Sequence, residues 1–356
     1  MFIQIVHLSI DLENFQLRDI NLDCDQGDYV VIIGPTGSGK SVILETLAGF
    51  YKPDEGKIIL EDKDITNVPP EKRNMSIVYQ DYVLFPHMSV YDNIAYGLKK
   101  RILDKSLIEK EVKAIASLLK IEHLLHRLPV TLSGGEAQRT AIARALVVKP
   151  RLLLMDEPFS ALDVKIKEEL RHLVKTAIKR YQTTTIHVTH DLDDVWDLAT
   201  KVVVMREGEI LQVGPPEHIF ANPVNSFVAD FVGTNTLKCK IIDRKNNLTL
   251  LETGENIKLY SKDQGMPGKE VIVSIRPEHI LVSSEPIFGY ALNTFCGMIA
   301  KTRVQGQLVW LTLNIEGLSL KAVLTANAYE MLKLDKKTKV FISIKTSDVR
   351  ITAPKH

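Results

Sequence analysis

The stretch VVIIGPTGSGKSVILETLAGF, residues 30–50, decides the fold of this 356-residue chain. An apolar, β-branched run from Val30 to Ile33 leads into a glycine-rich loop, residues 34–41, and a helical pattern follows from Val42 to Leu47. Strand, loop and helix together match G-x-x-x-x-G-K-[ST] in the context that the pattern requires. Glycines let successive N–H groups point at one anion, and the helix N-terminus favours negative charge. We predict a phosphate-binding loop; the alternative is a turn that only joins strand to helix.

The side chains of this phosphate loop (residues 34–41) have distinct predicted tasks. Lys40 is expected to reach the β- and γ-phosphates of a nucleoside triphosphate, and the Ser41 hydroxyl to ligate Mg²⁺. The remaining positions are expected to hold the phosphates mainly through the backbone: Gly34, Pro35, Thr36, Gly37, Ser38 and Gly39.

Length and composition limit the classes of protein to which this chain can belong. At 356 residues it exceeds the usual size of a single core, which favours two domains. The 45 basic and 44 acidic residues leave a net charge of +1, which gives no support to nucleic-acid binding. Cys24, Cys239 and Cys296 lie far apart, which argues against a disulfide scaffold or zinc site. We find no signal peptide pattern and no apolar run of membrane-spanning length, so a membrane role would need a partner.

The first two thirds of the chain alternate strand and helix patterns. Residues 2–10 and 16–24 alternate apolar with polar and predict antiparallel strands. Further strands are predicted at 57–60, 76–79, 152–155, 184–188, 201–205 and 209–213. Helices are predicted at about 89–119, at 164–181 and from about 191 onward, and residues 132–149 are predicted as a loop that leads into an amphipathic helix. This alternation predicts a largely parallel sheet covered on both faces.

The pattern changes near residue 235. Residues 213–235 read as a connector of short helices, and short period-2 segments follow, interrupted by one helical stretch at 326–334. One turn is predicted at Gln305-Gly306. The segments predict an all-β domain of small-barrel type; they are residues 237–242, 248–253, 256–260, 270–276, 308–313, 318–324 and 339–344.

Polar residues follow several of the predicted strands. Asp156 ends the apolar run 152–155, where it can hold Mg²⁺, and Glu157 can orient or deprotonate an attacking water. Gln80 can bind metal or water, and His190 can hydrogen-bond a γ-phosphate. The alternatives are a surface acidic pair, a plain turn glutamine and a capping or core histidine.

Residues 132–136, LSGGE, place a hydroxyl and two glycines at the start of a helix. Such a helix start is a second anion-binding surface, although it has no lysine. A helix N-cap with a capping glutamate explains Ser133 and Glu136 equally well.

The order of these motifs resembles the ATP-binding cassette family over about residues 1–235, and specifically the ATPase subunit of an ABC importer. The motifs in chain order are the phosphate loop, Gln80, LSGGE, LLLMDE, Ser160-Ala-Leu-Asp163 and His190. The resemblance implies an enzyme that hydrolyses ATP with Mg²⁺ held by Ser41, Gln80 and Asp156. It implies that Glu157 is the general base and His190 the γ-phosphate switch. It also implies two kinds of contact with a second subunit. The ATP held by that subunit would be contacted by Ser133, Gly134 and Gly135, and the subunit itself by Asp163.

The resemblance also implies a fold class. It is α/β, a P-loop NTPase of the ABC cassette type over 1–234, with a mixed, largely parallel sheet, an antiparallel β subdomain and a helical subdomain at about 82–150. An OB-like, all-β regulatory domain follows over 235–356. SIRPEH, residues 274–279, resembles the small-barrel domain of such importers, which implies a possible oxyanion site there.

Adenine recognition departs from the family pattern. The family usually has an aromatic residue near position 12, where this chain has Leu12, with Phe15 three residues later. Either the base packs on the aliphatic side chain or Phe15 substitutes for the aromatic residue.

The resemblance implies partners and a location as well. They are a head-to-tail homodimer, membrane permease subunits that dock near residues 80–97, and an extracytoplasmic solute-binding protein, with this chain peripheral at the cytoplasmic face. The cassette looks most like molybdate/tungstate import ATPases, followed by sulfate/thiosulfate, polyamine or sugar importers. A non-transport ATPase of DNA repair or translation is the alternative from another class. Two observations disfavour this non-transport alternative. Only about 90 residues separate the phosphate loop from LSGGE, where repair members carry a long coiled coil, and one cassette is present, where translation members usually carry two.

Overall fold

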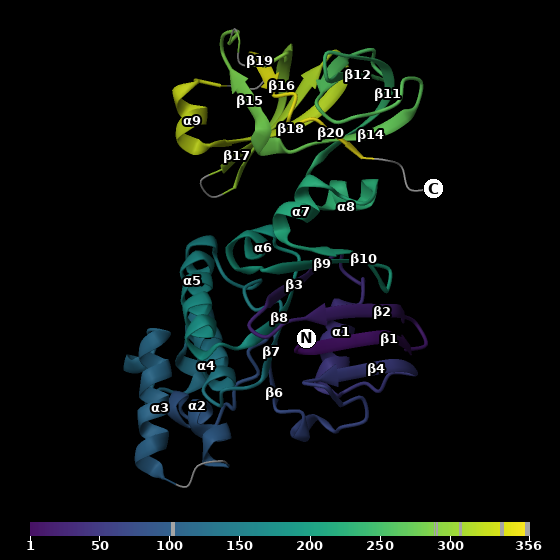
Figure 1. Ribbon diagram of the computed structural model, residues 1–356. Coiled ribbons are helices and arrows are strands. Elements are labelled where there is room, and N and C mark those ends of the chain that lie inside the picture. Colours follow the sequence, from purple (N-terminus) through teal and green to yellow (C-terminus); the bar gives the residue numbers. More distant parts are fainter. Residues whose placement is uncertain (101–103, 288, 290, 306–307, 335–337, 353–356) are drawn as a thin grey trace. The chain divides into compact units, whose positions relative to one another are not determined.

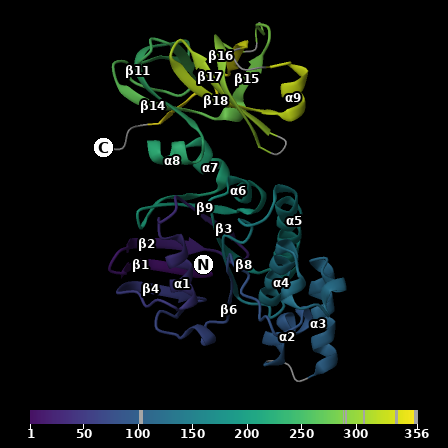
Figure 2. The same cartoon turned by 180° about the vertical axis from the view of Figure 1, so that it is seen from behind.

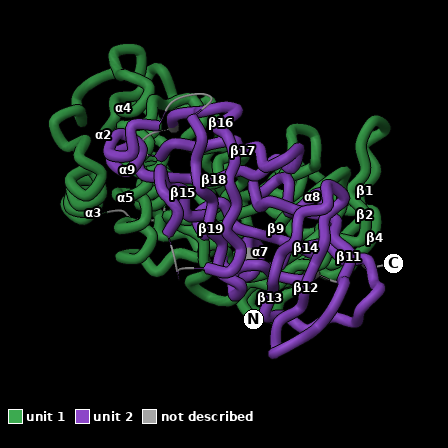
Figure 3. The backbone as a smooth tube through the Cα atoms, turned by 90° about the horizontal axis from the view of Figure 1, so that it is seen from above, with its two compact units in different colours: residues 1–216 green, residues 217–356 purple. Residues whose placement is uncertain are grey.

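The computed structural model describes the chain except residues 101–103, 288, 290, 306–307, 335–337 and 353–356. The chain divides into two compact units, residues 1–216 and 217–356 (Figure 3). The sequence placed the division at 234/235. In the structure the segment of short helices groups with the β-rich second unit instead; its helices are α7 (Pro216–Ala221) and α8 (Ser226–Phe231).

A six-stranded sheet forms the centre of the first unit, in the order β10-β9-β3-β8-β7-β6. Every neighbouring pair is parallel except β9 with β10, which form a hairpin. The predicted, largely parallel sheet is therefore confirmed. Its strands are β3 (Tyr29–Ile33), β6 (Met75–Val78), β7 (Leu152–Asp156), β8 (Thr184–Thr189), β9 (Lys201–Arg206) and β10 (Glu209–Gly214).

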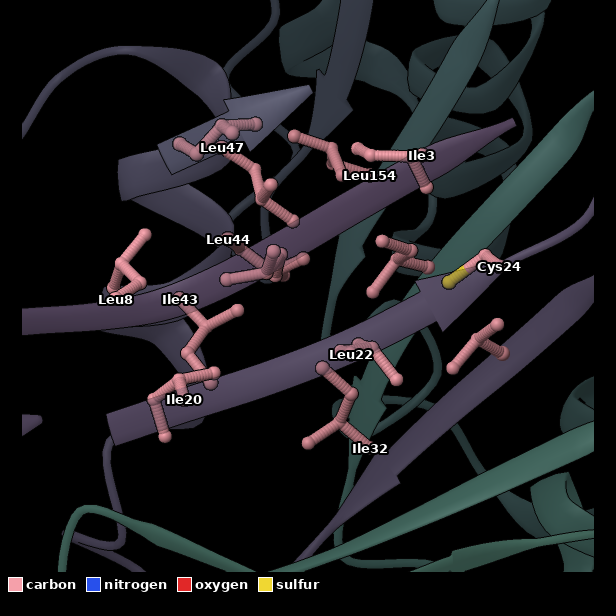
Figure 4. Close-up of a cluster of buried hydrophobic side chains, with 14 of the residues drawn as sticks. Ile3, Leu8, Ile20, Leu22, Cys24, Ile32, Ile43, Leu44, Leu47 and Leu154 are labelled. Carbon is pink, nitrogen blue, oxygen red and sulfur yellow. The ribbon is translucent and has the colours of Figure 1, made fainter. Parts of the chain in front are cut away.

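An antiparallel sheet in the order β2-β1-β4-β5 packs beside it. Figure 4 shows how side chains of β1, β2 and α1 meet those of the central sheet in one cluster that includes Ile20, Ile32, Leu44 and Leu154. Burial of this cluster fixes α1, and hence the phosphate loop before it, between the two sheets. The elements are β1 (Ile3–Asp11), β2 (Gln16–Cys24), α1 (Lys40–Ala48), β4 (Glu55–Leu60) and β5 (Lys63–Asp64).

Helices α2 to α5 gather away from strands β1, β2 and β4, as the opposite views of Figures 1 and 2 both show. The helix predicted over 89–119 is two helices, because the Asp104 side chain accepts a hydrogen bond from the N–H of Ser106 and starts a new helix. The helices are α2 (Val90–Lys99), α3 (Lys105–Leu118), α4 (Gly134–Leu146), α5 (Val164–Tyr181) and α6 (Leu192–Leu198), with 3₁₀ turns η1 (Pro70–Lys72), η2 (Glu122–Leu124) and η3 (Pro129–Thr131).

The second unit contains two five-stranded antiparallel sheets, β13-β12-β11-β14-β20 and β15-β19-β16-β17-β18, that share one hydrophobic cluster. This confirms the all-β prediction, although the sequence reading missed β15, β16 and β20. The predicted turn at Gln305-Gly306 lies partly outside the described residues. The elements are β11 (Asn235–Lys245), β12 (Leu248–Thr253), β13 (Lys258–Ser261), β14 (Glu270–Ile275), η4 (Pro277–His279), β15 (Ile280–Ser283), β16 (Asn293–Gln305), β17 (Leu308–Ile315), β18 (Leu318–Thr325), α9 (Ala326–Met331), β19 (Lys339–Ile344) and β20 (Arg350–Thr352).

Two buried asparagines join these sheets reciprocally. Asn235 of β11 donates to the carbonyl oxygen of Lys321 in β18 at 2.8 Å and accepts from its N–H at 2.6 Å. Asn293 of β16 makes the same pair of bonds to the backbone of Tyr260 in β13, at 2.9 and 2.6 Å. A buried amide that lost such partners would be costly, so the two bonds fix how the sheets pack.

Candidate functional site

Four parallel strand ends meet at one edge of the central sheet. Ile33 of β3 lies beside Thr189 of β8, and Asp156 at the end of β7 lies beside Val188. Strand β6 runs parallel to β7 and ends at Val78. In open α/β sheets ligands bind outside the carboxyl ends of the strands. The structure therefore brings to one edge the predicted site residues Gly34, Gln80, Glu157 and His190.

The Lys40 side chain is buried and folded back onto its own loop. Its Nζ donates to the carbonyl oxygens of Gly34 and Pro35, at 2.9 Å each. Burial lowers the pKa of Lys40, and the negative charges of Glu157 and Asp156 oppose that shift. The ammonium thus lies close to both carboxylates, where a phosphate could replace the two carbonyl contacts.

The shape of the loop depends on glycine and leaves one buried hydroxyl unpaired. A Cβ at Gly34 would collide with the carbonyl oxygen of Met205, and Gly39 has φ 96°, in the left-handed region. The Ser38 hydroxyl is buried and has no hydrogen-bond partner among the described residues. The Gly208 N–H, at the tip of the β9–β10 hairpin, donates to the carbonyl oxygen of Ser38 at 3.2 Å. An unpaired buried hydroxyl in a loop of this shape suits a phosphate oxygen.

Ser41 and Asp156 lie in direct contact. A hydrogen bond from Ser41 and the charge of Lys40 lower the pKa of Asp156, but burial outweighs both and raises it. The charge of Asp156 also adds to burial in raising the pKa of Glu45. A hydroxyl and a carboxylate side by side are hard oxygen ligands, so the pair fits Mg²⁺.

Glu157 and His190 form the closest pair of predicted catalytic residues. Nδ1 of His190 lies 2.7 Å from Oε1 of Glu157, and their side chains are 64% and 17% exposed. Glu157 has φ 46°, in the left-handed region that is costly for a residue with a Cβ, and its N–H donates to Val188 at 2.9 Å. Strained backbone of this kind is common at functional sites.

Gln80 lies exposed in the turn after β6, and the segment that follows it is strained. Tyr82 and Val83 have φ of 62° and 46°. The buried side chain of Asn93, in α2, accepts from the Phe85 N–H at 2.9 Å and donates to the carbonyl oxygen of Phe85. The amide of Asn93 thus holds this loop on α2.

Arg144 joins the same loop to the helix that follows LSGGE. Its guanidinium lies 5.0 Å from the centre of the Phe85 ring, and its Nη2 donates to the carbonyl oxygen of Tyr82 at 3.3 Å. Helix α4, which begins in LSGGE, and the segment after Gln80 therefore form one packed group. Sequence reasoning missed both Asn93 and Arg144, because nothing local marks a buried polar residue as an anchor.

The LSGGE residues serve as a helix cap in this chain. The Ser133 N–H donates to the Glu136 carboxylate at 2.7 Å, and the Ser133 hydroxyl accepts from the N–H of Glu136. Gly134 faces the Tyr82 hydroxyl, and Gly135 faces Ile166. The capping alternative is therefore correct locally, while Ser133 and Gly134 remain exposed and open to a ligand from outside.

Asp163 caps helix α5, accepting a hydrogen bond from the N–H of Ile166 at 3.2 Å. Upstream of it, the Ser160 hydroxyl donates to the carbonyl oxygen of Glu157 at 3.0 Å. The segment from Glu157 to Asp163 is thereby held as one turn.

Phe15, rather than Leu12, lies at the phosphate loop. A Cβ on Gly39 would lie 2.5 Å from the Phe15 ring. Leu12 and Phe15 are both partly buried against the core cluster. A hollow of about 360 Å³ opens here, lined by Glu13, Asn14, Phe15, Gln16, Arg18, Gly37 and Glu207. Glu207 comes from the β9–β10 hairpin, between the predicted strands 201–205 and 209–213, and sequence reasoning gave it no role.

Many known proteins resemble this chain in sequence or in structure. The sequence pattern of the family described as ABC transporter matches residues 17–160. The chain is 43% identical over 350 residues to the molybdate/tungstate import ATP-binding protein WtpC of Pyrococcus abyssi, covering 98% of this chain and 99% of that protein. It is 37% identical over 306 residues to the spermidine/putrescine import ATP-binding protein PotA of Thermotoga maritima, covering 83% and 82%.

Solved structures resemble the chain as well. One is cbiO1 from Clostridium perfringens, part of the ABC transporter complex cbiONQ, at 32% identity and a TM-score of 0.58, covering 62% of this chain and 90% of that one. Another is a dimeric post-hydrolysis state of the ATP-binding cassette MJ0796 bound to ADP and Pi, at 25% identity and a TM-score of 0.54, covering 60% and 98%.

Proposed function

Because this chain belongs to the family of ABC transporter ATP-binding proteins that serve import, we propose that it hydrolyses ATP to drive uptake of molybdate or tungstate. The ATPase role in an importer follows from the family. The choice of solute is carried by one observation: the 43% identity with a molybdate/tungstate import protein extends over 98% of this chain and so includes the second unit.

We assign the steps of hydrolysis to residues at the edge of the central sheet. The phosphate loop and Lys40 bind the triphosphate of ATP. Mg²⁺ would be held by Ser41, Gln80 and Asp156, and when bound it would supply positive charge to the phosphates. Glu157 accepts a proton from the attacking water, and its contact with His190 keeps the two side chains on the same side of the γ-phosphate. His190 is exposed enough to reach that phosphate as a hydrogen-bond donor.

The site needs a second copy of the chain to be complete. Ser133 and Gly134 are exposed at the start of α4, and α4 packs against α2, α5 and β6 rather than forming part of the phosphate loop. A partner placed head to tail would present its own helix start to the γ-phosphate. The similar cassette structure, which is dimeric and bound to ADP and Pi, supports a site that works in a dimer.

We further propose that a membrane permease docks on the loop after Gln80 and on α2. No helix in the described part of the chain is long and apolar enough to cross a membrane. On this surface Val83 is 56% exposed and Tyr96 37% exposed, and the Tyr96 ring lies 4.7 Å from that of Phe85. Exposed apolar residues grouped in this way suit a protein partner. The chain would then lie peripherally on the cytoplasmic face.

The test is reconstitution of the transporter in proteoliposomes with its permease and solute-binding protein. ATP hydrolysis is measured with the binding protein loaded with molybdate, tungstate, sulfate or spermidine. We expect molybdate and tungstate to stimulate hydrolysis and sulfate and spermidine to leave it at the basal rate. The Lys40→Ala variant, which lacks the phosphate-binding ammonium, should bind and hydrolyse no ATP. Stimulation by sulfate or spermidine alone would refute the solute assignment while leaving the ATPase role intact.

A further inference from the structure

A buried arginine on α5 lies at the centre of a charged network behind His190. The Arg171 side chain is only 4% exposed. Its Nε lies 2.6 Å from a carboxylate oxygen of Asp194, which is 2% exposed, and its Nη2 lies 2.9 Å from Asp191. The planar guanidinium of arginine has several N–H donors and can bond two carboxylates at once, which the single ammonium of lysine cannot do in the same geometry.

The network holds the backbone on both sides of His190. Asp191, directly after His190, bonds Arg171, and its own N–H donates to the Thr189 hydroxyl at 3.0 Å. The Thr189 hydroxyl in turn donates to Asp194 at 2.7 Å. The residues before and after His190 are therefore tied to one guanidinium, while the His190 side chain itself is exposed and bonded to Glu157.

Arg171 also lies on the helix that Asp163 caps, about two turns from its start. Helix α5 is thus joined to the catalytic segment at two places. The turn from Glu157 to Asp163 leads into its N-terminus, and Arg171 holds the loop that carries His190. Lys167, one turn before Arg171, reaches Asp191 at 3.7 Å and strengthens the second connection.

We propose that Arg171 is a positioning residue for ATP hydrolysis: it fixes the loop 189–191 so that His190 stays against Glu157 and faces the γ-phosphate. The inference rests on the proposed role of His190 in the site. Arg171 does not touch the nucleotide, so its loss changes the rate of hydrolysis through His190 and leaves the phosphate loop unaltered.

The test is a double-mutant cycle between Arg171→Lys and His190→Ala, measured as steady-state ATP hydrolysis by the full chain. Lysine keeps the charge and cannot bond both carboxylates. We expect Arg171→Lys to lower kcat about tenfold and to change KM by less than about twofold. His190→Ala should lower kcat about a hundredfold, and the double variant should match His190→Ala alone, because residues that act through one another are not additive.

Glu169→Gln is the matched control. Glu169 lies on the same helix and forms ion pairs with Lys120 and Arg139, away from the network around His190. This variant should keep kcat within about twofold of the parent. If Arg171→Lys fails to fold, Asp191→Asn replaces it, because Asp191 is 22% exposed and its loss removes one arm of the network.

The outcomes separate this inference from the proposed function. Rate losses that multiply in the double variant, or an unchanged kcat in a folded Arg171→Lys protein, would overturn the role of Arg171 while leaving the ATPase site in place. Full activity of His190→Ala would overturn both the role of His190 and that of Arg171. Absence of ATP hydrolysis in the unmodified chain would instead count against the proposed function.

Discussion

The amide nitrogen of Gly208 lies 3.2 Å from the carbonyl oxygen of Ser38, and this hydrogen bond joins the tip of the β9–β10 hairpin to the phosphate loop. Gly208 has φ 82°, and a Cβ there would collide with the carbonyl oxygen of Gln16 in β2. The hairpin tip, β2 and the phosphate loop therefore meet at a point where only glycine fits.

Replacement of Gly208 by alanine should weaken ATP binding about tenfold, because the collision moves the hairpin tip off Ser38 and loosens the loop. Binding is measured by titration with a fluorescent ATP analogue. Gly254→Ala is the control, because a Cβ there meets nothing within 4 Å and Gly254 lies in the second unit. Equal affinity of the Gly208→Ala variant and the parent would show that the hairpin tip does not support the loop.

Glu157→Gln should bind ATP and lose at least about a hundredfold in hydrolysis, because an amide cannot accept the proton of the attacking water. The nucleotide then stays between two copies of the chain. Gel filtration with Mg²⁺ and ATP should show a stable dimer for this variant and none for Lys40→Ala. A monomer under the same conditions would contradict both the base role of Glu157 and the two-copy site.

Phe15→Ala should weaken ATP binding by about tenfold, because the aromatic ring beside the phosphate loop offers a stacking surface for adenine. Leu12→Ala should change affinity by less than about twofold, since the hollow beside the phosphate loop is lined by Phe15 and not by Leu12. Phe15→Trp, which keeps a stacking surface, should restore binding. A larger loss for Leu12→Ala than for Phe15→Ala would reverse the assignment.

The second unit is predicted to bind the transported oxyanion and to slow hydrolysis. Trp196 and Trp310 are the two tryptophans of the chain, and Trp310 lies in β17 of the second unit. In a Trp196→Phe variant, micromolar molybdate or tungstate should change the fluorescence of Trp310 and depress the ATPase rate of the assembled transporter. Sulfate serves as the control anion in both measurements. No response of either readout to molybdate or tungstate would remove this regulatory role.

Acid should destabilise the protein through His187. This side chain is fully buried, its Nδ1 lies 3.1 Å from the Tyr29 hydroxyl, and burial lowers its pKa from 6.5 to about 3. Below the ordinary pKa the unfolded chain takes up a proton that the folded chain does not, so stability falls as pH falls. Between about pH 7.5 and pH 5 this group costs about 2 kcal/mol of the unfolding free energy.

Urea unfolding of the parent and of His187→Gln at these two pH values measures that cost. Glutamine keeps a hydrogen-bonding group near Tyr29 but does not titrate, so the variant should lose about 2 kcal/mol less than the parent on acidification. The same pH dependence in both proteins would mean that His187 is protonated in the folded state.

Local patterns predicted the strands and helices of the central sheet because each is set by residues close in sequence. The phosphate loop, with apolar Val30 to Ile33 before it and a helix after it, is such a case. Strand β16 was missed because Gly297, Lys301 and Arg303 interrupt its alternation and its register shifts between Ile299 and Lys301. Its pairing with β17 and β19, rather than its own sequence, makes it a strand.

The candidate site could be predicted from the sequence to about the same extent as the fold. Residues after strand ends were identified because parallel strands bring their carboxyl ends to one edge. The contact between Arg171 and the residues beside His190 was not predictable, because it joins a helix and a loop twenty residues apart through charges that look like ordinary surface residues. Burial of those charges is visible only in three dimensions.

The reciprocal asparagines of the second unit have a consequence for how that unit can be inherited or engineered. Asn235 and Asn293 each complete the hydrogen bonding of the opposite sheet. A chimaera that exchanges one sheet alone would therefore leave a buried amide without its partners in each of the two sheets. Residues 217–356 should therefore transfer between proteins as an indivisible block, and unfold in one step.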